Sequence, residues 1–504
     1  MSATQPPADH VVLISVDAMR WDFLTPGWPA PTMQQQMAHG AVIPRLRSIA
    51  PSLTYPAHAT LATGALPARH GVVYNRPFEP EGASGRWLWE AEHIQVPTLW
   101  DAVRDAGGTS AALTWPVTVG APIDWNIPEV WDPTDEASQL EVLAQHTTPP
   151  ELLEELRRDV TGEIPPDAFR GYDLIRADLA GAIAAHLLET RTPTLLAVHL
   201  VAVDAQQHEE GRDGPRVWRA LAAADRAVGR MVEAAERAGI ADRTAFIAMG
   251  DHGFVDVHTK LAPNVWLAEA GLRPVDPKEG GWEATFHVAD GAAFLHVSAG
   301  SGEEAGPSSD AGLSSGAGSS GGAAPPNDPT PYGDKNITGE SGPAAEGPEG
   351  ATPHPEHAAP SGESFTEETA EALEKRVRRI LALLPWRVQR LFTVAERETL
   401  DAMGASPNAR LALSGRPGVT FVEDAEGDDV RPGSGGAHGH LPDLPEVDAA
   451  LVAWGAGIRP GSMAPEAELT DVAPLAAHLL GLDLPPADGI VLRGLLEEPR
   501  EADG

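Results

Sequence analysis

The sequence predicts an α/β fold in which a mainly parallel central sheet lies between two layers of helices. Short apolar segments rich in β-branched residues alternate with longer helical patterns, which is typical of parallel sheets covered on both faces. The chain has 504 residues and 42% of them are hydrophobic, enough to bury a large core. Three predicted strands carry an aspartate at or just past their carboxyl ends, where ligands collect in such sheets.

Five segments have the composition of buried strands. Each combines apolar and β-branched residues over a short run, and most of them end abruptly in polar residues. They are residues 11–17, 109–115, 194–204, 244–253 and 447–457.

Helical patterns separate these strands. Residues 57–63 have the small side chains of a short helix that stops at Gly64, so Thr54 falls where this helix begins. Longer patterns predict four further helices, of which the last is amphipathic. They span residues 97–107, 171–190, 214–239 and 366–384.

A smaller α+β insertion is expected to interrupt the core. The predicted core comprises residues 1–267 and 431–504, and the insertion comprises residues 268–430. Residues 299–364 are rich in Gly, Ser, Pro and Ala and nearly free of large apolar side chains. Because burial cannot offset the entropy of ordering such a segment, we expect it to be disordered.

Composition limits the classes of partner. The formal net charge of −37 disfavours nucleic-acid polymers and anionic membranes, because both attract basic surfaces. The absence of cysteine excludes disulfides and cysteine-ligated zinc, which leaves His, Asp and Glu as strong metal ligands. The first residues lack the apolar stretch of a secretory signal, and no apolar run is long enough to span a membrane. A cytoplasmic location is therefore expected, and the oligomeric state is left open.

Two carboxylate–histidine pairs follow predicted strands. Asp204 and His208 are four residues apart, so they lie either on one face of a helix or on a strand-to-loop connection. Asp251 and His252 are adjacent, and the glycine that follows them permits a sharp turn. Carboxylate and imidazole together suit a borderline divalent ion such as Zn²⁺.

Two further residues complete a set of ligands sufficient for two metal ions. They are the strand-terminal Asp17 and His438, which lies in a glycine-rich turn. Two metal ions can clamp the attacking and leaving oxygens of a phosphoryl displacement. Thr54 is the expected nucleophile, because a dication lowers the pKa of a hydroxyl and a helix N-terminus favours the resulting anion. The alternative role of this threonine is an ordinary helix N-cap.

Six segments in this order resemble the alkaline phosphatase superfamily, and within it the nucleotide pyrophosphatase/phosphodiesterase branch. They are VDAMR, TYPAHATLATG, HGVVYN, VDAQQH, GDHG and GAHGH, and the resemblance covers about residues 10–265 and 435–490. It implies an alkaline-phosphatase-like three-layer fold, two zinc ions and a threonine nucleophile. Mn²⁺ could replace Zn²⁺ with the same ligands.

The resemblance also implies a role for each residue of the site. One ion would be held by Asp17, Thr54, Asp251 and His252, and the other by Asp204, His208 and His438. The family has an asparagine that binds a phosphoryl oxygen, and Asn75 stands at the corresponding distance after Thr54. The implied reaction is hydrolysis of phosphodiester or pyrophosphate bonds in small nucleotide-type substrates, through a covalent phospho-threonine intermediate.

Other residues near these motifs have competing interpretations. His58 and His70 are expected in structural or supporting hydrogen bonds rather than as metal ligands. Trp115 either lines the substrate pocket or belongs to the core. Tyr74 and Phe78 either stack on a nucleobase or simply pack.

The same core could serve a phosphomonoesterase. A monoester carries an additional charged oxygen, which such enzymes often bind with a lysine and an arginine. Residues 76–200 contain no lysine, and this favours diesters or pyrophosphates. A catalytically silent family member that binds nucleotides is a further alternative, which the full set of expected ligands disfavours.

Overall fold

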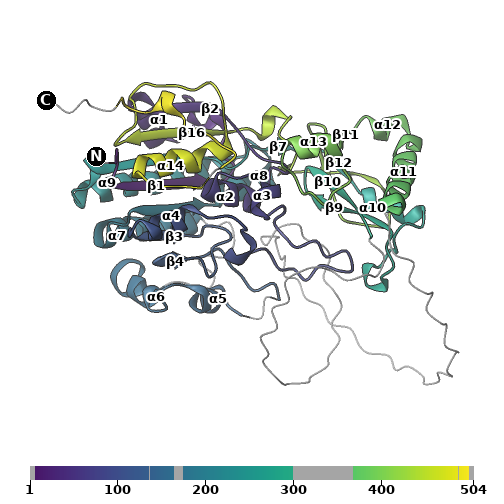
Figure 1. Ribbon diagram of the computed structural model, residues 1–504, viewed down its shortest axis with the longest axis horizontal. Helices are drawn as coiled ribbons and strands as arrows, with labels where there is room; N and C mark the ends of the chain where they lie inside the picture. Colours follow the sequence, from purple (N-terminus) through teal and green to yellow (C-terminus); the bar gives the residue numbers. More distant parts are fainter. Residues whose placement is uncertain (1–5, 135–136, 164–173, 299–366, 486, 499–504) are drawn as a thin grey trace, which may run out of the picture.

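The computed structural model describes residues 6–134, 137–163, 174–298, 367–485 and 487–498 (Figure 1). The predicted disordered segment 299–364 lies outside these ranges. So do residues 171–173 and 366, at which two of the predicted helices begin.

An eight-stranded sheet forms the centre of the larger part of the molecule (Figure 1), in the order β17-β2-β16-β6-β1-β5-β3-β4. Strand β16 is antiparallel to β2 and β6, and every other neighbouring pair is parallel. The prediction of a mainly parallel sheet is therefore confirmed. The strands are β1 (His10–Val16), β2 (Ala41–Arg47), β3 (Ser110–Leu113), β4 (Trp125–Ile127), β5 (Leu195–Leu200), β6 (Thr244–Met249), β16 (Ala449–Gly455) and β17 (Ala467–Glu468).

Alternate residues of the central strand β1 point into two separate cores. Val12, Ile14 and Val16 pack with one set of helices, whereas Val11 and Leu13 pack with another. This alternation gives the three layers, and each fully buried aliphatic side chain contributes about 1.5–3 kcal/mol. The first set is α1 (Pro31–His39), α7 (Leu174–Arg191), α8 (Ala202–Glu210) and α9 (Pro215–Arg237), and the second is α2 (Thr54–Thr63), α4 (Leu99–Asp105) and α14 (Val472–Leu480).

The same part also contains α3 (Pro67–His70), α5 (Gln139–His146) and α6 (Leu152–Leu156). Within the described ranges, no helix combines the length and the apolar character that crossing a bilayer requires.

A second core lies in the chain between β6 and β16. The antiparallel sheet β11-β12-β10-β9 and the helices around it form the smaller part of Figure 1 and bury Phe286, Leu295, Val377 and Leu413 together. Its elements are β9 (Ala284–Ala289), β10 (Ala292–Val297), β11 (Phe392–Glu396), β12 (Leu411–Gly415), α10 (Pro263–Glu269), α11 (Glu367–Leu383), α12 (Trp386–Gln389) and α13 (Arg397–Ala402). The division into core and insertion at residues 268 and 430 stays a prediction.

Two small sheets join this second core to the first. One pairs β8 (Thr259–Leu261) with β13 (Val419–Phe421) and β14 (Val430–Pro432), and the other pairs β7 (Val255–Asp256) with β15 (Gly436–Ala437). The second of these sheets places residues 436–437 beside residues 255–256, which follow β6 closely in the chain. The turn that contains His438 is thereby brought back near the carboxyl end of β6.

Helix α2 begins at Thr54 itself. The preceding Leu53 has an extended backbone and supplies no side-chain cap. Thr54 is thus the first helical residue, and the N-cap alternative is wrong because the cap position falls one residue earlier. Gly64 ends the helix as predicted, in the left-handed conformation with φ of 70°.

Candidate active site

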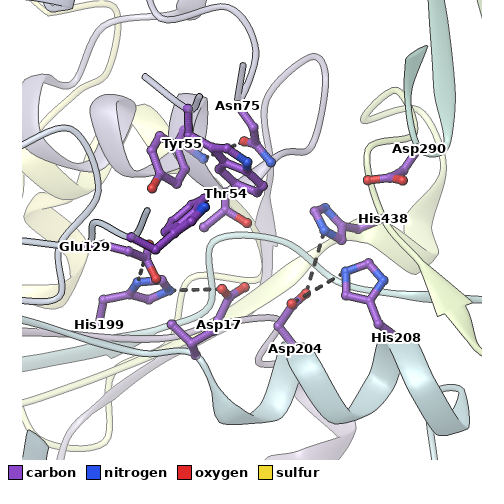
Figure 2. A pocket seen from close by; sticks show the side chains of 13 residues that line it. Asp17, Thr54, Tyr55, Asn75, Glu129, His199, Asp204, His208, Asp290 and His438 are labelled. Carbon is purple, nitrogen blue, oxygen red and sulfur yellow. Dashed lines mark hydrogen bonds and ion pairs between the residues drawn. The ribbon is translucent and has the colours of Figure 1, made fainter. Parts of the chain in front are cut away.

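A pocket opens beside the carboxyl ends of β1 and β5, and Figure 2 shows side chains from distant parts of the chain converging on it. Its lining combines carboxylates and imidazoles with aromatic rings. The lining residues are Asp17, Thr54, Tyr55, Asn75, Trp87, Glu129, Trp131, His199, Val201, Asp204, His208, Asp290 and His438.

Asp17 follows β1 directly, and its two carboxylate oxygens have different partners. Oδ2 accepts a hydrogen bond from Nε2 of His199 at 2.9 Å. Oδ1 lies 3.4 Å from Nε2 of His252, and this buried atom has no hydrogen-bond partner among the described residues. One oxygen is therefore fixed by the protein and the other faces the site.

Asp251 and His252 follow β6 in a similar arrangement. Oδ1 of Asp251 accepts from the backbone N–H groups of Ala18 and His252, both at 3.0 Å, while Oδ2 is buried without a described hydrogen-bond partner. Nε2 of His252 lies 3.3 Å from this Oδ2 and 3.3 Å from Oγ1 of Thr54. The hydroxyl of Thr54 is thus in contact with His252, one of the candidate metal ligands.

Asp204 and His208 lie on one face of α8, so of the two alternatives for this pair the structure has the helix. Nδ1 of His208 lies 3.2 Å from the carbonyl oxygen of Gly436, which turns Nε2 towards Oδ2 of Asp204 at 3.5 Å. Nδ1 of His438 lies 2.8 Å from the carbonyl oxygen of Ser52, and its Nε2 lies 3.7 Å from Oδ1 of Asp204. Figure 2 shows the two contacts of Asp204, with His208 and with His438.

The ligand atoms fall into two groups that share one histidine. Those of Asp17, Asp251 and His252 lie within 4.8 Å of one another, and so do those of Asp204, His252 and His438. His208 adjoins the second group through Asp204. The expected assignment of four and three ligands stays a prediction, and the geometry adds that His252 is within reach of both groups.

The electrostatics of the site favour a bound cation. Burial and the neighbouring carboxylates Asp251 and Asp204 raise the pKa of Asp17 well above its usual value. Burial also raises the pKa of Asp204 to about 7 and lowers that of His252 well below its usual value. Oδ1 of Asp17, Oδ1 of Asp204 and Oδ2 of Asp251 are buried without a described hydrogen bond. Since buried polar atoms are normally paired, three such oxygens around two imidazoles fit divalent metal ions.

Asn75 is held against the first turn of α2. The backbone N–H of Tyr55 donates to Oδ1 of Asn75 at 3.0 Å, so the amide NH₂ is the group that Asn75 can offer to a ligand. Thr54 and Asn75 both line the pocket, and the expected contact of Asn75 with a phosphoryl oxygen stays a prediction.

Several pocket residues were not expected from the sequence. Tyr55 adjoins the nucleophile motif, but Trp87 and Trp131 come from irregular segments that carry no recognisable pattern. Asp290 lies at the turn between β9 and β10, and its position depends on the second core. His199 could have been singled out from the sequence, because it is a lone histidine that interrupts the apolar run of β5.

Other residues singled out in the sequence are not part of the pocket lining. Trp115 is buried in the core against His58 and Trp100. Tyr74 and Phe78 pack on His296 of β10 rather than lining the pocket. His58 and His70 make supporting contacts, to the carbonyl oxygen of Thr54 at 2.8 Å and to Oγ1 of Thr60 at 3.0 Å respectively.

The chain is similar to known phosphodiesterases. The family described as "Type I phosphodiesterase / nucleotide pyrophosphatase" matches residues 11–311. Human ectonucleotide pyrophosphatase/phosphodiesterase family member 5 is 31% identical over 23% of this chain and 25% of that protein. An uncharacterised pyrophosphatase/phosphodiesterase of Schizosaccharomyces pombe is 25% identical over 51% of this chain and 47% of that protein. The match thus spans a quarter to about half of these relatives' own length.

The fold also has solved counterparts. Human ectonucleotide pyrophosphatase/phosphodiesterase 5 aligns with 97% of this chain and 100% of its own at a TM-score of 0.60 and 16% identity. Murine member 5, as an inactive threonine-to-alanine variant in complex with AMP, aligns with 98% of this chain at the same TM-score. The predicted alkaline-phosphatase-like fold is confirmed by this similarity.

Proposed function

Because the chain belongs to the type I phosphodiesterase/nucleotide pyrophosphatase family, we propose that it hydrolyses phosphodiester or pyrophosphate bonds in small nucleotide-type substrates. One observation carries the proposal. The Thr54 hydroxyl lies at the first turn of α2 in contact with His252, which is within reach of both groups of candidate metal ligands.

Thr54 is the proposed nucleophile. Its side chain is buried beside His252, at a helix N-terminus whose dipole favours a negatively charged oxygen or a bound phosphate. The Thr54 hydroxyl loses its proton and attacks phosphorus, the bond to the leaving oxygen breaks, and the leaving group takes up a proton. Water then attacks the phospho-threonine, which releases the phosphorylated product and restores the hydroxyl. Murine member 5 is described as inactive when a threonine is replaced by alanine, which supports this assignment.

Two divalent ions are the proposed cofactors. Asp17, Thr54, Asp251 and His252 would hold one ion, and Asp204, His208 and His438 the other. This set of oxygen and imidazole donors suits Zn²⁺ and also fits Mn²⁺. When bound, such ions lower the pKa of a hydroxyl and neutralise charge on phosphoryl oxygens. Asn75 supplies an additional N–H donor to a non-bridging oxygen.

The pocket wall favours a diester or pyrophosphate over a monoester. Among the described lining residues are the carboxylates of Asp17, Glu129, Asp204 and Asp290, and there is neither a lysine nor an arginine. The guanidinium of Arg76 lies 5.4 Å from the centre of the Trp87 ring and is not part of the lining. Asp17 and Asp204 are proposed metal ligands and Glu129 is paired with Arg176, so Asp290 is the lining carboxylate left to repel a second negative charge on the substrate. The rings of Tyr55, Trp87 and Trp131 offer apolar faces to a nucleobase, and the AMP complex of murine member 5 supports this substrate class.

The test compares wild type with Thr54→Ala on chromogenic phosphodiesters, phosphomonoesters and dinucleotides. We expect kcat for diesters to fall at least about 10³-fold while bound metal is retained through the other ligands. Thr63→Ala is the matched control, because Thr63 ends the same helix and its hydroxyl has only local backbone partners among the described residues: it donates to the carbonyl oxygen of Ala59 and accepts from the backbone N–H of Ala65. Hydrolysis at the wild-type rate by the Thr54 variant would overturn the proposal, and faster cleavage of monoesters would reassign the substrate class.

A further inference from the structure

A chain of three buried polar side chains lies behind Asp17, on the side away from the other candidate ligands. Nε2 of His199 donates to Oδ2 of Asp17 at 2.9 Å. On the opposite edge of the ring, Nδ1 of His199 lies 3.6 Å from Oε2 of Glu129. Arg176 then donates from Nη2 to Oε1 of Glu129 at 2.7 Å. Figure 2 shows the links between Glu129, His199 and Asp17.

Each member of this chain comes from a different element. His199 belongs to β5, Glu129 follows β4, and Arg176 lies on α7. Exposure is 1% for His199, 6% for Glu129 and 5% for Arg176. Burying charged groups carries a desolvation penalty that their mutual attraction only partly offsets, so such a chain is a poor device for stability alone.

The imidazole ring of His199 is fixed from both sides. Its Nδ1 lies 3.0 Å from the carbonyl oxygen of Thr114, and Oγ1 of Thr114 donates to the carbonyl oxygen of His199 at 2.7 Å. Every partner of the two ring nitrogens (the Thr114 carbonyl and the carboxylates of Glu129 and Asp17) is an acceptor. The ring therefore presents an N–H at Nε2 to Asp17.

The two oxygens of the Asp17 carboxylate therefore have different roles. The hydrogen bond from His199 occupies Oδ2 and stops the carboxylate from rotating. Oδ1 is left without a hydrogen bond, 3.4 Å from Nε2 of His252, and faces the other candidate ligands. A carboxylate held in this way offers one oxygen to a metal ion in a fixed direction.

We propose that Arg176, Glu129 and His199 form a positioning relay that orients the Asp17 carboxylate for one of the two metal ions. The relay deepens the proposed function and rests on it, since it concerns the same site. His199 acts on the metal through Asp17, Glu129 holds His199, and Arg176 holds Glu129.

The test measures metal binding to the metal-stripped protein rather than turnover. Zn²⁺ titration with a competing chelator gives the affinity of each ion, and the visible absorption of bound Co²⁺ reports ligand geometry. His199→Leu removes the donor, and we expect one ion to bind about 10–100-fold more weakly while the other changes less than about threefold. His199→Gln keeps an N–H donor of comparable reach and is expected to restore most of the affinity. Arg176→Met should weaken the same ion, by a smaller factor.

A control variant separates positioning from loss of stability. Asp225→Asn alters another buried carboxylate, which accepts from the backbone N–H groups of Thr32 and Met33 at 3.0 and 2.9 Å in the outer helical layer. It should lower thermal stability and leave both metal affinities unchanged. Unchanged binding of both ions by His199→Leu, or equal weakening of both ions, would overturn the relay. If wild type bound no divalent ion, the proposed function itself would fail, which is a different result.

Discussion

His252 and His438 stack face to face, with ring centroids 3.8 Å apart and ring planes 8° from parallel. The two histidines come from opposite ends of the chain segment that holds the second core. Their contact brings the ligands that follow β6 next to those on α8.

Replacing His438 should remove one metal ion. For His438→Ala we expect metal analysis to find about one ion per chain instead of two, with kcat for diesters reduced by at least about 10²-fold. His440→Gln is the matched control, because Nε2 of His440 lies 2.9 Å from the carbonyl oxygen of Val419, outside the ligand groups. Two retained ions in the His438 variant would contradict the assignment.

Metal affinity and stability of the metal-free protein should change with pH in opposite directions. The folded-state pKa of Asp204 is about 7, against 3.8 for an ordinary aspartate, because of burial. Between about pH 4 and 7 the folded metal-free protein therefore holds a proton that the unfolded chain has lost. Its free energy of unfolding falls as pH rises through this window, at up to about 1.4 kcal/mol per pH unit.

A cation must displace the same proton, so its affinity should rise across that window. Urea unfolding of the metal-free protein and chelator competition, both at several pH values, measure the two trends. If the free energy of unfolding and the metal affinity both rose with pH, Asp204 would not titrate in this range.

Acid should destabilise the fold through His70. Burial lowers its pKa to about 3, and its Nδ1 accepts a hydrogen bond from the backbone N–H of Val72 at 3.1 Å, which a protonated ring could not do. The neutral His70 ring contributes fully to the free energy of unfolding above pH 6.5. This contribution is lost as pH falls towards 3, and the free energy of unfolding decreases by up to about 1.4 kcal/mol per pH unit.

His70→Asn keeps an acceptor for Val72 without a titrating ring. We expect the free energy of unfolding of this variant to fall less steeply between pH 6.5 and 5 than that of wild type. If the free energy of unfolding, measured in urea, changed equally steeply with pH in the variant and in wild type, the pKa of His70 would not be lowered.

Asp290 should contribute to discrimination against monoesters. Its carboxylate lies beside His208 and His438 in the pocket lining (Figure 2), where it would repel a doubly charged terminal phosphate. Removing one charge at about 4 Å in a solvated pocket corresponds to about 1 kcal/mol, so Asp290→Asn should raise the monoester-to-diester ratio of kcat/KM about fivefold. Asp276→Asn, on an exposed turn, serves as the control. A ratio that did not move would exclude this role.

Five strands of the main sheet (β1, β3, β5, β6 and β16) were predictable because each contains a short apolar run that marks a buried strand. The strands β2, β4 and β17 were missed, since β2 contains a proline and two arginines and the other two are only two or three residues long. The structure shortens the predicted runs, and β5 ends at Leu200 because the chain turns into α8 before Asp204. The residues expected to bind metal follow such strands or lie in short distinctive turns, and the structure brings their side chains close together. That they bind metal ions stays a prediction, and so does their assignment to particular ions.

The rest of the pocket depends on tertiary packing. Glu129 and Arg176 are polar residues without a local pattern, and only the packing of α7 beside the sheet brings them together. Trp87 and Trp131 contact each other from separate irregular segments, with ring centroids 4.9 Å apart. From the sequence, Tyr74 and Phe78 could either stack on a nucleobase or pack within the protein. In the structure they pack against Phe294 and His296 of the second core.

The contact between His438 and the carbonyl oxygen of Ser52 closes a loop of 386 residues. Closing so long a loop is slow and comes late in folding, because everything between its ends must first become compact. During synthesis the amino-terminal half, with Thr54, Asp17 and the α8 pair, leaves the ribosome long before its last ligand. The nascent chain therefore carries an incomplete acidic site until the second core has folded and residue 438 has docked beside residue 52. If the two proposed metal ions bind, the site that includes His438 would consequently be filled late in the maturation of this protein.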